Sequence, residues 1–253
     1  MIKGLDIFRD HFKDYKDSYL LIGGVACHLI MDEAGVDFRA TKDLDIVLCA
    51  ESLDSGFIEH FWRFVKAGGY QNQNRSTGNK QFYRFDKPTT SGYPFMLELF
   101  SKAPNQLDIA DNTLLTPIPA ENDIASLSAI LLNEEYYQCI LKGKNIINDV
   151  PVLGAEFILP MKAKAWLDLS QRKEEGLAID SKAIKKHRND VFRLSVLLAP
   201  TQRVNIPESM KIDLSNFLLK MRSEPEINLK AFGVSTNLTG TIEILGKIYD
   251  IEN

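Results

Sequence analysis

Cysteine, histidine and long apolar segments are scarce in this chain of 253 residues. The three cysteines, Cys27, Cys49 and Cys139, lie far apart in apolar surroundings. This spacing excludes a disulfide framework or a cysteine-rich zinc site and predicts reduced thiols in the core. The four histidines show no metal-ligand spacing. No apolar run approaches the ~20 residues of a membrane span, and the first residues form no apolar signal segment. We therefore expect a cytoplasmic protein without membrane partners.

A net positive charge is also missing, because 34 acids outnumber 30 Lys and Arg residues and give a formal charge of −4. This balance argues against a broadly basic nucleic-acid surface but permits a local one. Residues 160–193 contain nine Lys or Arg and five Asp or Glu, a local charge of +4. The stretch is either a basic surface for phosphate-rich ligands or a solvated helix face, and the sequence leaves both interpretations open.

The chain does contain two glycines followed by a pair of alternating acids. The apolar segment 19–22 predicts a strand that turns at Gly23 and Gly24 into a helix, whose backbone can approach a phosphate closely. Asp43 and Asp45 follow on a second strand, and alternation places both on one face. Two carboxylates there repel each other unless a cation such as Mg²⁺ lies between them. A surface strand with alternating acids is the alternative.

A third acid completes this pattern. Glu98 is the single charge in the apolar run 95–100, which predicts a central strand. A carboxylate is almost never buried in such a strand unless it is paired or bound to metal. We expect Glu98 to share the cation with the two aspartates; a solvent-facing Glu98 is the alternative. Asp86 and Asp108, in turn-like sequence, are the fallback acids.

The segment from Leu21 to Leu48 resembles the nucleotidyltransferases related to DNA polymerase beta, and within them the AbiEii group of abortive-infection toxins. The matching positions of this segment are Gly23, Gly24, Arg39, Thr41, Asp43 and Asp45. A second block matches downstream, with Lys162 on a helix, then Arg172, then Lys186 and Asp190 ahead of an apolar helix. Two positions depart from the group's pattern, Val25 for a small hydroxyl residue and His187 for an Asp.

The resemblance implies an enzyme that transfers a nucleoside monophosphate from an NTP to an acceptor hydroxyl with one or two Mg²⁺ ions, Mn²⁺ being an alternative. Asp43, Asp45 and Glu98 are expected to bind the metal and carry the catalysis. Seven residues are expected at the nucleotide: Gly23, Gly24, Arg39, Thr41, Lys162, Lys186 and Asp190. The AbiEii likeness implies tRNA or another RNA as acceptor and a separate antitoxin protein as partner. Transfer to a small hydroxylated compound, as by aminoglycoside nucleotidyltransferases, and a catalytically inactive nucleotide-binding module are the alternatives.

The sequence predicts an α/β (α+β) fold, with a mixed nucleotidyltransferase-like sheet and flanking helices in a catalytic domain (1–118) and a mostly helical C-terminal domain (119–253). The expected elements of the first domain are helices at 1–18, 25–34 and 55–67, strands at 19–22, 44–49, 81–85 and 95–100, a loop at 71–79 and a linker at 111–119. Those of the second are helices at 121–132, 156–172, 181–198, 208–222 and 238–250, with strands or a hairpin within 136–152.

Overall fold

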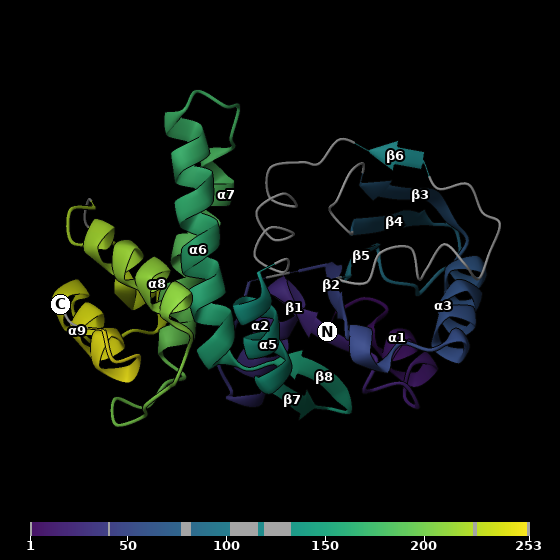
Figure 1. The fold of residues 1–253 in the computed structure, drawn as a ribbon, viewed down its shortest axis with the longest axis horizontal. Helices are drawn as coiled ribbons and strands as arrows, with labels where there is room; N and C mark the ends of the chain where they lie inside the picture. The colour runs from purple at the N-terminus through teal and green to yellow at the C-terminus, as the bar shows by residue number, and fades with distance from the viewer. Residues whose placement is uncertain are drawn as a thin grey trace. The chain divides into compact units, whose positions relative to one another are not determined.

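The computed structural model describes residues 2–39, 41–76, 82–101, 116–118, 133–224 and 227–251. The chain divides into two compact units, drawn in Figure 1. Unit 1 comprises Met1–Ile124 and Lys144–Leu153, and unit 2 comprises Ala125–Gly143 and Gly154–Asn253. The mixed α/β fold expected from the sequence is confirmed.

Unit 1 is built on an eight-stranded sheet with the order β6-β3-β4-β5-β2-β1-β8-β7. Three neighbouring pairs, β2/β5, β1/β8 and β3/β6, run parallel and the others antiparallel, so the sheet is mixed. Its strands are β1 (Tyr19–Ile22), β2 (Asp43–Leu48), β3 (Tyr70–Ser76), β4 (Phe82–Pro88), β5 (Met96–Ser101), β6 (Thr116–Ile118), β7 (Lys144–Ile147) and β8 (Val150–Leu153). The described helices of unit 1 are α1 (Leu5–His11), α2 (Gly23–Glu33) and α3 (Ser55–Gly68), with a 3-10 turn, η1 (Ala50–Ser52).

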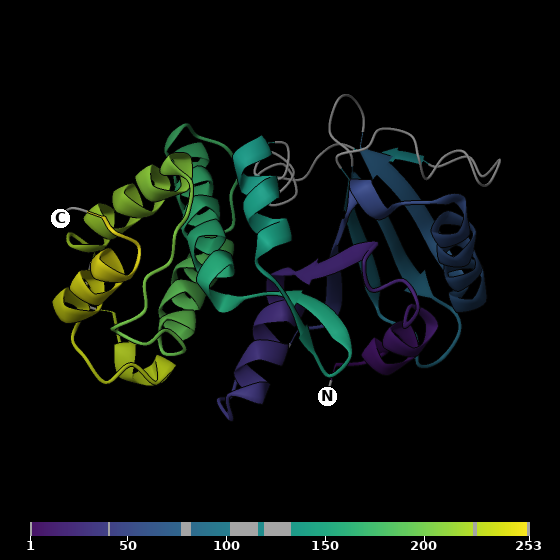
Figure 2. The ribbon, with the colours of Figure 1, turned by 60° about the horizontal axis from the view of Figure 1, so that its bottom comes forward.

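Aromatic side chains from α1 and α3 pack one face of this sheet. Phe8 of α1 meets Tyr19 of β1 edge-on at 5.3 Å between ring centroids, and Phe61 of α3 meets Phe85 of β4 at 5.4 Å. Both helices lie beside the sheet in Figure 2. Because successive residues of a strand point to opposite faces, the neighbour of Phe85, Arg84, belongs to the other face. That face carries the candidate site.

Unit 2 is helical in its described part. Its helices are α5 (Glu134–Lys142), α6 (Ala155–Glu174), α7 (Ser181–Ser195), α8 (Glu208–Met221) and α9 (Leu238–Ile248), with a 3-10 turn, η2 (Leu229–Phe232). The long helix α6 packs against both α7 and α8. Trp166 of α6 and Phe217 of α8 meet edge-on at 5.4 Å between ring centroids. No helix among the described residues combines the length and apolarity needed to cross a membrane.

A proline inside α6 is accommodated by a contact from the end of α9. Pro160 has no N–H, so the carbonyl of Glu156, four residues earlier, receives no helical hydrogen bond from it. The buried hydroxyl of Tyr249 donates to that carbonyl at 2.7 Å. Burial also raises the pKa of Tyr249 well above its ordinary value, so the hydroxyl keeps the proton that it donates. This replacement lets α6 continue through the proline.

Several expected element boundaries are wrong. The predicted loop 71–79 is a strand over its described part, because the polar segment of β3 pairs with β4 and β6, and pairing in a sheet overrides weak strand propensity. Residues 116–118, expected in a linker, form β6. The entry helix predicted for 1–18 is only α1.

The segment 136–152, expected to add strands or a hairpin, begins as helix α5 before the hairpin β7–β8. Asn133 caps α5 by accepting from the backbone N–H of Glu135 at 3.0 Å. The hairpin turns at Asn148 and Asp149, both with positive φ, as a two-residue hairpin turn requires. Because β8 pairs with β1, this hairpin belongs to unit 1, although it comes from the range assigned to the C-terminal domain. The helix predicted for 121–132, and the rest of the linker at 111–119, lie outside the described residues.

Candidate functional site

Two of the expected acids lie side by side on neighbouring strands. The parallel strands β2 and β5 pair in a register that sets Asp45 opposite Glu98 and Asp43 opposite Met96. Residues directly opposite each other share a face of the sheet, and Asp43 lies on that face too, two residues before Asp45. The structure therefore brings all three predicted carboxylates to the face that α1 and α3 do not cover.

A basic residue from the next strand joins this row. Antiparallel pairing sets Arg84 of β4 opposite Glu98. Its Nε and Nη2 donate to Glu98 Oε1 at 3.0 and 2.8 Å. Only 14% of the Arg84 side chain and 13% of the Glu98 side chain are exposed, so water screens this ion pair weakly. The row across the sheet thus reads Asp45, Glu98, Arg84.

The environment of Glu98 opposes its charge despite Arg84. Burial is the largest influence, followed by the charge of Asp45 and the hydrogen bond between the two carboxyl groups. Together these raise the pKa of Glu98 to about 8, while Arg84 lowers it. The raised pKa favours the protonated form of Glu98, whose carboxyl group can donate a hydrogen bond to Asp45. Two adjoining carboxyl groups that need a proton between them form a place where a cation can replace that proton.

The two glycines make room for the protein's own side chains. Gly23 has φ +66°, and a Cβ there would lie 1.7 Å from Asp45 Oδ2. The backbone N–H of Gly24, in the first turn of α2, donates to the same oxygen at 3.3 Å. The helix N-terminus, expected to receive a phosphate, here faces Asp45, which is itself an anion suited to the positive end of the helix dipole. Any side chain at Gly23 would push this carboxylate away.

Arg39 and Thr41 also lie at the glycine turn. A Cβ on Gly24 would lie 2.6 Å from Thr41 Oγ1 and 3.6 Å from Arg39 Nη2. The guanidinium of Arg39 also stacks over the Phe38 ring, with Cζ 5.1 Å from the centroid. The segment before β2 thus places a hydroxyl and a cation against the start of α2. The glycines, Arg39, Thr41 and Asp45 therefore lie close together.

Sequence reasoning missed one residue of this face, Arg84. Its strand has an alternating pattern that could have placed it beside Glu98 only once the register of β4 against β5 was known. Lys42 and Phe95 precede β2 and β5 directly, and Lys42 Nζ lies 4.1 Å from the centroid of the Phe95 ring. Phe95 is 43% exposed. By alternation Lys42 and Phe95 belong to the opposite face from Asp43 and Glu98, so this contact between a cation and a ring is not part of the acidic row.

The fallback acids have different outcomes. Asp86 of β4 lies opposite Met96, which lies opposite Asp43, so all three share one face. Asp108 lies outside the described residues.

Two of the three expected nucleotide-binding residues of unit 2, Lys162 and Asp190, belong to a buried ion cluster. Asp190 of α7 is fully buried, and its Oδ2 lies 3.8 Å from Nζ of Lys162, which is 7% exposed. Arg193 approaches the other oxygen at 3.3 Å and also stacks on Phe232. Lys186, one turn before Asp190, is exposed. Lys162 and Asp190 therefore join α6 to α7, which is a structural role whether or not a nucleotide binds.

Oxygen donors dominate the site of unit 1, as Mg²⁺ requires. Among the residues that the structure describes, no group of three or more His, Cys, Asp or Glu is placed to hold a metal ion. The adjoining pair of Asp45 and Glu98 is nonetheless sufficient protein ligation, because Mg²⁺ is usually held by one or two carboxylates plus substrate phosphates. The donor set thus fits a divalent cation that binds together with phosphate.

No model of a known protein family matches the chain, and no curated protein sequence matches it. Among solved structures, the chain is similar to an antigenic nucleotidyltransferase-like protein from Paracoccidioides brasiliensis, with a TM-score of 0.47 and 16% identity over 96% of this chain and 94% of that one. It is also similar to the Megavirus polyadenylate synthase, with a TM-score of 0.41 and 12% identity over 87% of this chain and 36% of that one. At such scores, function is argued from the side chains of the site.

Proposed function

We propose that this chain is a metal-dependent nucleotidyltransferase that moves a nucleoside monophosphate from an NTP to an acceptor hydroxyl. The observation that carries the proposal is the register of β2 and β5, which sets Asp45 beside Glu98 with Asp43 on the same face. Two adjoining carboxyl groups against a glycine turn form an acidic site that a divalent cation and a polyphosphate complete together.

Asp45 and Glu98, with Asp43, would hold Mg²⁺. When bound, this ion would neutralise the triphosphate and the departing pyrophosphate. Arg84 holds Glu98 in place through two N–H groups and keeps it aligned with Asp45. Gly24 fixes Asp45 from the other side through its backbone N–H. The carboxylates are thus oriented before substrate arrives, which is the condition for efficient electrostatic catalysis.

The proposed reaction forms one bond and breaks one. The acceptor hydroxyl oxygen attacks the α-phosphorus of the NTP, the bond from that phosphorus to the bridging oxygen breaks, and pyrophosphate leaves. The hydroxyl proton passes to a carboxylate of the site and from there to solvent. Arg39, at the glycine turn, supplies positive charge for the phosphates.

We propose RNA as the acceptor and a separate antitoxin protein as the regulator. The support is the AbiEii resemblance together with the local charge of +4 in residues 160–193. Phosphate-rich acceptors are attracted to such a stretch, and their binding weakens as salt rises because counterions are released. Lys162, Lys186 and Asp190 belong to this stretch, and the buried pair Lys162–Asp190 holds its two helices together.

The test is transfer of label. Purified protein is incubated with Mg²⁺, each α-labelled NTP, and either total tRNA or a panel of hydroxylated antibiotics. Label on RNA that requires Mg²⁺ and disappears in Asp45→Asn supports the proposal. The matched control is Glu59→Gln, which removes one exposed acid from α3 of the same unit. Label on an antibiotic alone would replace RNA by a small molecule as the acceptor. NTP binding without transfer to any acceptor would contradict catalysis.

A further inference from the structure

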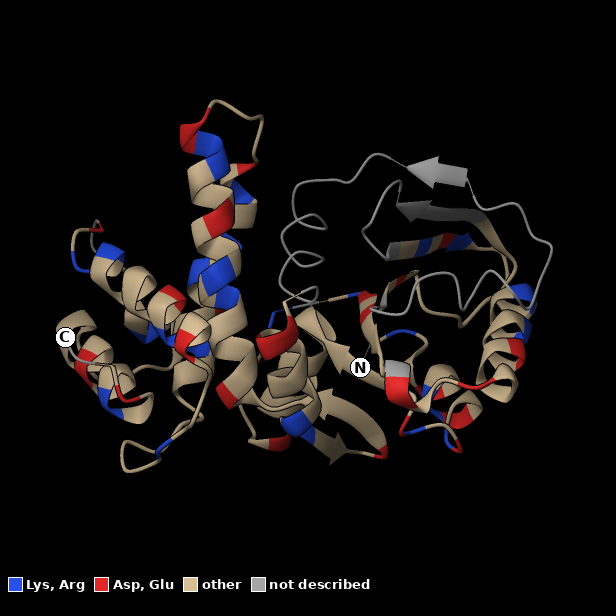
Figure 3. Ribbon diagram, in the orientation of Figure 1, with Lys and Arg blue, Asp and Glu red and all other residues tan. Residues whose placement is uncertain are grey.

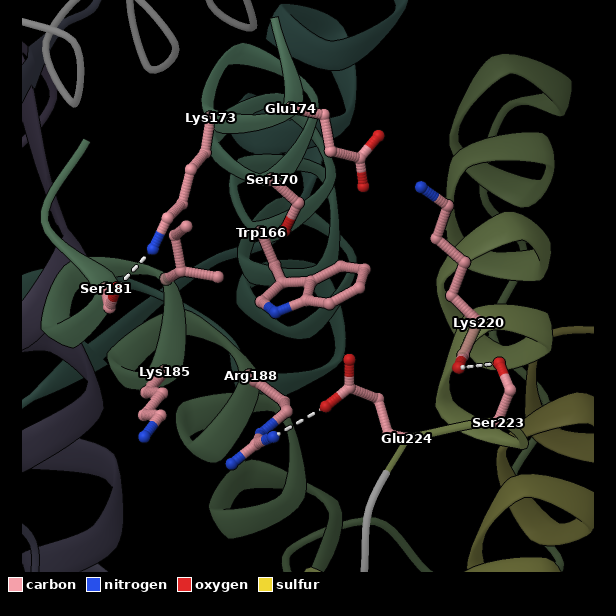
Figure 4. Close-up of a pocket in the computed structure, with 11 residues that line it drawn as sticks. Trp166, Ser170, Lys173, Glu174, Ser181, Lys185, Arg188, Lys220, Ser223 and Glu224 are labelled. Atoms are coloured by element: carbon pink, nitrogen blue, oxygen red, sulfur yellow. Dashed lines mark hydrogen bonds and ion pairs between the residues drawn. The ribbon is translucent and has the colours of Figure 1, made fainter. Parts of the chain in front are cut away.

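An open pocket lies between α6, α7 and the end of α8 in unit 2, and no residue of the acidic row lines it (Figure 4). Its volume is about 430 Å³. Trp166 forms part of its wall and is fixed there by its edge-on contact with Phe217. Three serine hydroxyls, one from each side of the pocket, also line it. The charged lining residues are Lys173, Glu174, Lys185, Arg188, Lys220 and Glu224.

The charges of this lining do not cancel. Four cations face two acids, an excess of two positive charges in a chain with a formal charge of −4. Arg188 is paired with Glu224 at 2.9 Å, and Lys173 donates to the hydroxyl of Ser181. Lys185 and Lys220 are exposed, and neither forms an ion pair with any residue that the structure describes. Two ammonium groups are therefore available to a ligand.

The helix dipoles explain only part of this charge. Lys173 and Lys220 lie in the last turns of α6 and α8, where a cation offsets the negative end of the dipole. The N-terminal half of α7 is different, because residues 181–189 contain four cations and no acid. Figure 3 shows Lys and Arg gathered along α6 and α7. Lys185 and Arg188 lie beyond the first turn of α7, where the helix dipole has little effect, so the dipole does not account for their charge. A surplus of positive charge at a pocket suits an anionic ligand.

We infer that this pocket binds a phosphate group, carried by a nucleotide or by a polynucleotide backbone. Ammonium groups, a guanidinium and hydroxyls from three sides line the pocket, and each can donate to a phosphate oxygen. The Arg188–Glu224 pair closes one side and keeps Glu224 from repelling the anion. This inference is independent of the proposed transfer reaction, because binding here needs neither the carboxylates of unit 1 nor a metal.

Calorimetry in the presence of EDTA tests the pocket separately from the metal site. The full chain is titrated with inorganic phosphate, tripolyphosphate and a short oligoribonucleotide. We expect binding that weakens by about fivefold in each of Lys185→Gln and Lys220→Gln. Lys185→Arg retains the charge and should retain affinity. Lys247→Gln is the matched control, because it removes the same charge from an exposed position of α9 in the same unit.

The phosphate source follows from which titrations respond. If Lys185→Gln and Lys220→Gln weaken the binding of tripolyphosphate and of RNA equally, the pocket binds phosphate groups in general. If they weaken the binding of RNA alone, the pocket binds a polynucleotide backbone. Absence of binding to all three ligands by folded protein at millimolar concentrations would overturn the inference. Equal weakening by Lys247→Gln would also overturn it, because the attraction would then be diffuse. Circular dichroism verifies that each variant is folded.

Discussion

Two buried ion clusters, one in each unit, differ in the sign of the charge that is left over. In unit 1, Glu98 contacts a second acid, Asp45, and one guanidinium, Arg84. In unit 2, Asp190 lies between two cations, Lys162 and Arg193. In the first cluster the neighbouring acid raises the pKa of Glu98 and favours its protonated form. In the second cluster two cations offset the charge of Asp190. Buried acids in excess indicate a place for a cation, while a surrounded acid indicates a structural joint.

The largest expected effect is the loss of transfer in Asp45→Asn. The amide keeps the shape of the side chain but removes the charge that adjoins Glu98 and receives the Gly24 N–H. We expect the rate of NTP-dependent labelling to fall by about a thousandfold. Stability without metal should change little, because the amide oxygen of Asn can still accept from the Gly24 N–H and the second acid that disfavours ionisation of Glu98 is gone. A thermal shift with Mn²⁺ in wild-type protein that is missing in this variant would locate the metal without any turnover.

The second effect concerns stability in unit 2. Lys162→Met removes one partner of the fully buried Asp190, and breaking a buried ion pair costs about 3–5 kcal/mol of unfolding free energy. The remaining partner, Arg193, should keep the loss near the lower end. Urea unfolding measures it, with Lys247→Met as the exposed control. A stable Lys162→Met protein with weakened nucleotide binding would contradict the structural role and favour the phosphate role.

The third effect is a change in pH dependence when Glu98→Gln is compared with wild type in EDTA. An acid whose pKa rises on folding, here to about 8, holds a proton in the folded state that the unfolded state has released. Its contribution is therefore fully favourable below the unfolded pKa and is lost as pH rises toward 8. Gln mimics the protonated acid and should remove this slope. We expect melting temperatures to coincide near pH 4 and the variant to be more stable at pH 8.

This third prediction would be contradicted if the melting temperatures of Glu98→Gln and wild type changed in parallel between pH 4 and pH 8. Arg84 supplies the internal check, because its charge lowers the pKa of Glu98. Arg84→Gln should raise that pKa further and extend the loss of stability to higher pH.

The acidic strand was predictable from sequence because its signals are local. The sequence shows directly the two glycines ahead of a helix and the single acid in an apolar run. It also shows the acids that alternate with a period of two residues, which is the period of a strand. The partner of Glu98, Arg84, was not identified from the sequence, because its position depends on the register of β4 against β5. The polar strand β3 was missed for the same reason, because its backbone is satisfied by β4 and β6.

The sequence also did not show which charged residues of the helices are buried. The sequence marks Lys162 and Asp190 as charged residues on separate helices, and both solvated and buried positions are compatible with that pattern. Only the packing of α6 on α7 brings them together. The positive charge of the stretch 160–193 could be counted from the sequence. Which of its cations are buried and which line the pocket could not be predicted.

The smallest expected effect completes the comparison with an ion pair that is exposed. Lys211 of α8 lies 3.0 Å from Asp250, whose side chain is 88% exposed, so water screens the attraction and both side chains lose freedom in making it. Lys211→Met keeps most of the aliphatic stem and should change the unfolding free energy by less than about 1 kcal/mol. The same urea titration used for Lys162→Met measures both losses on one scale. A loss for Lys211→Met equal to that for Lys162→Met would show that burial does not separate the two pairs, and the structural assignment of the Asp190 cluster would then fall.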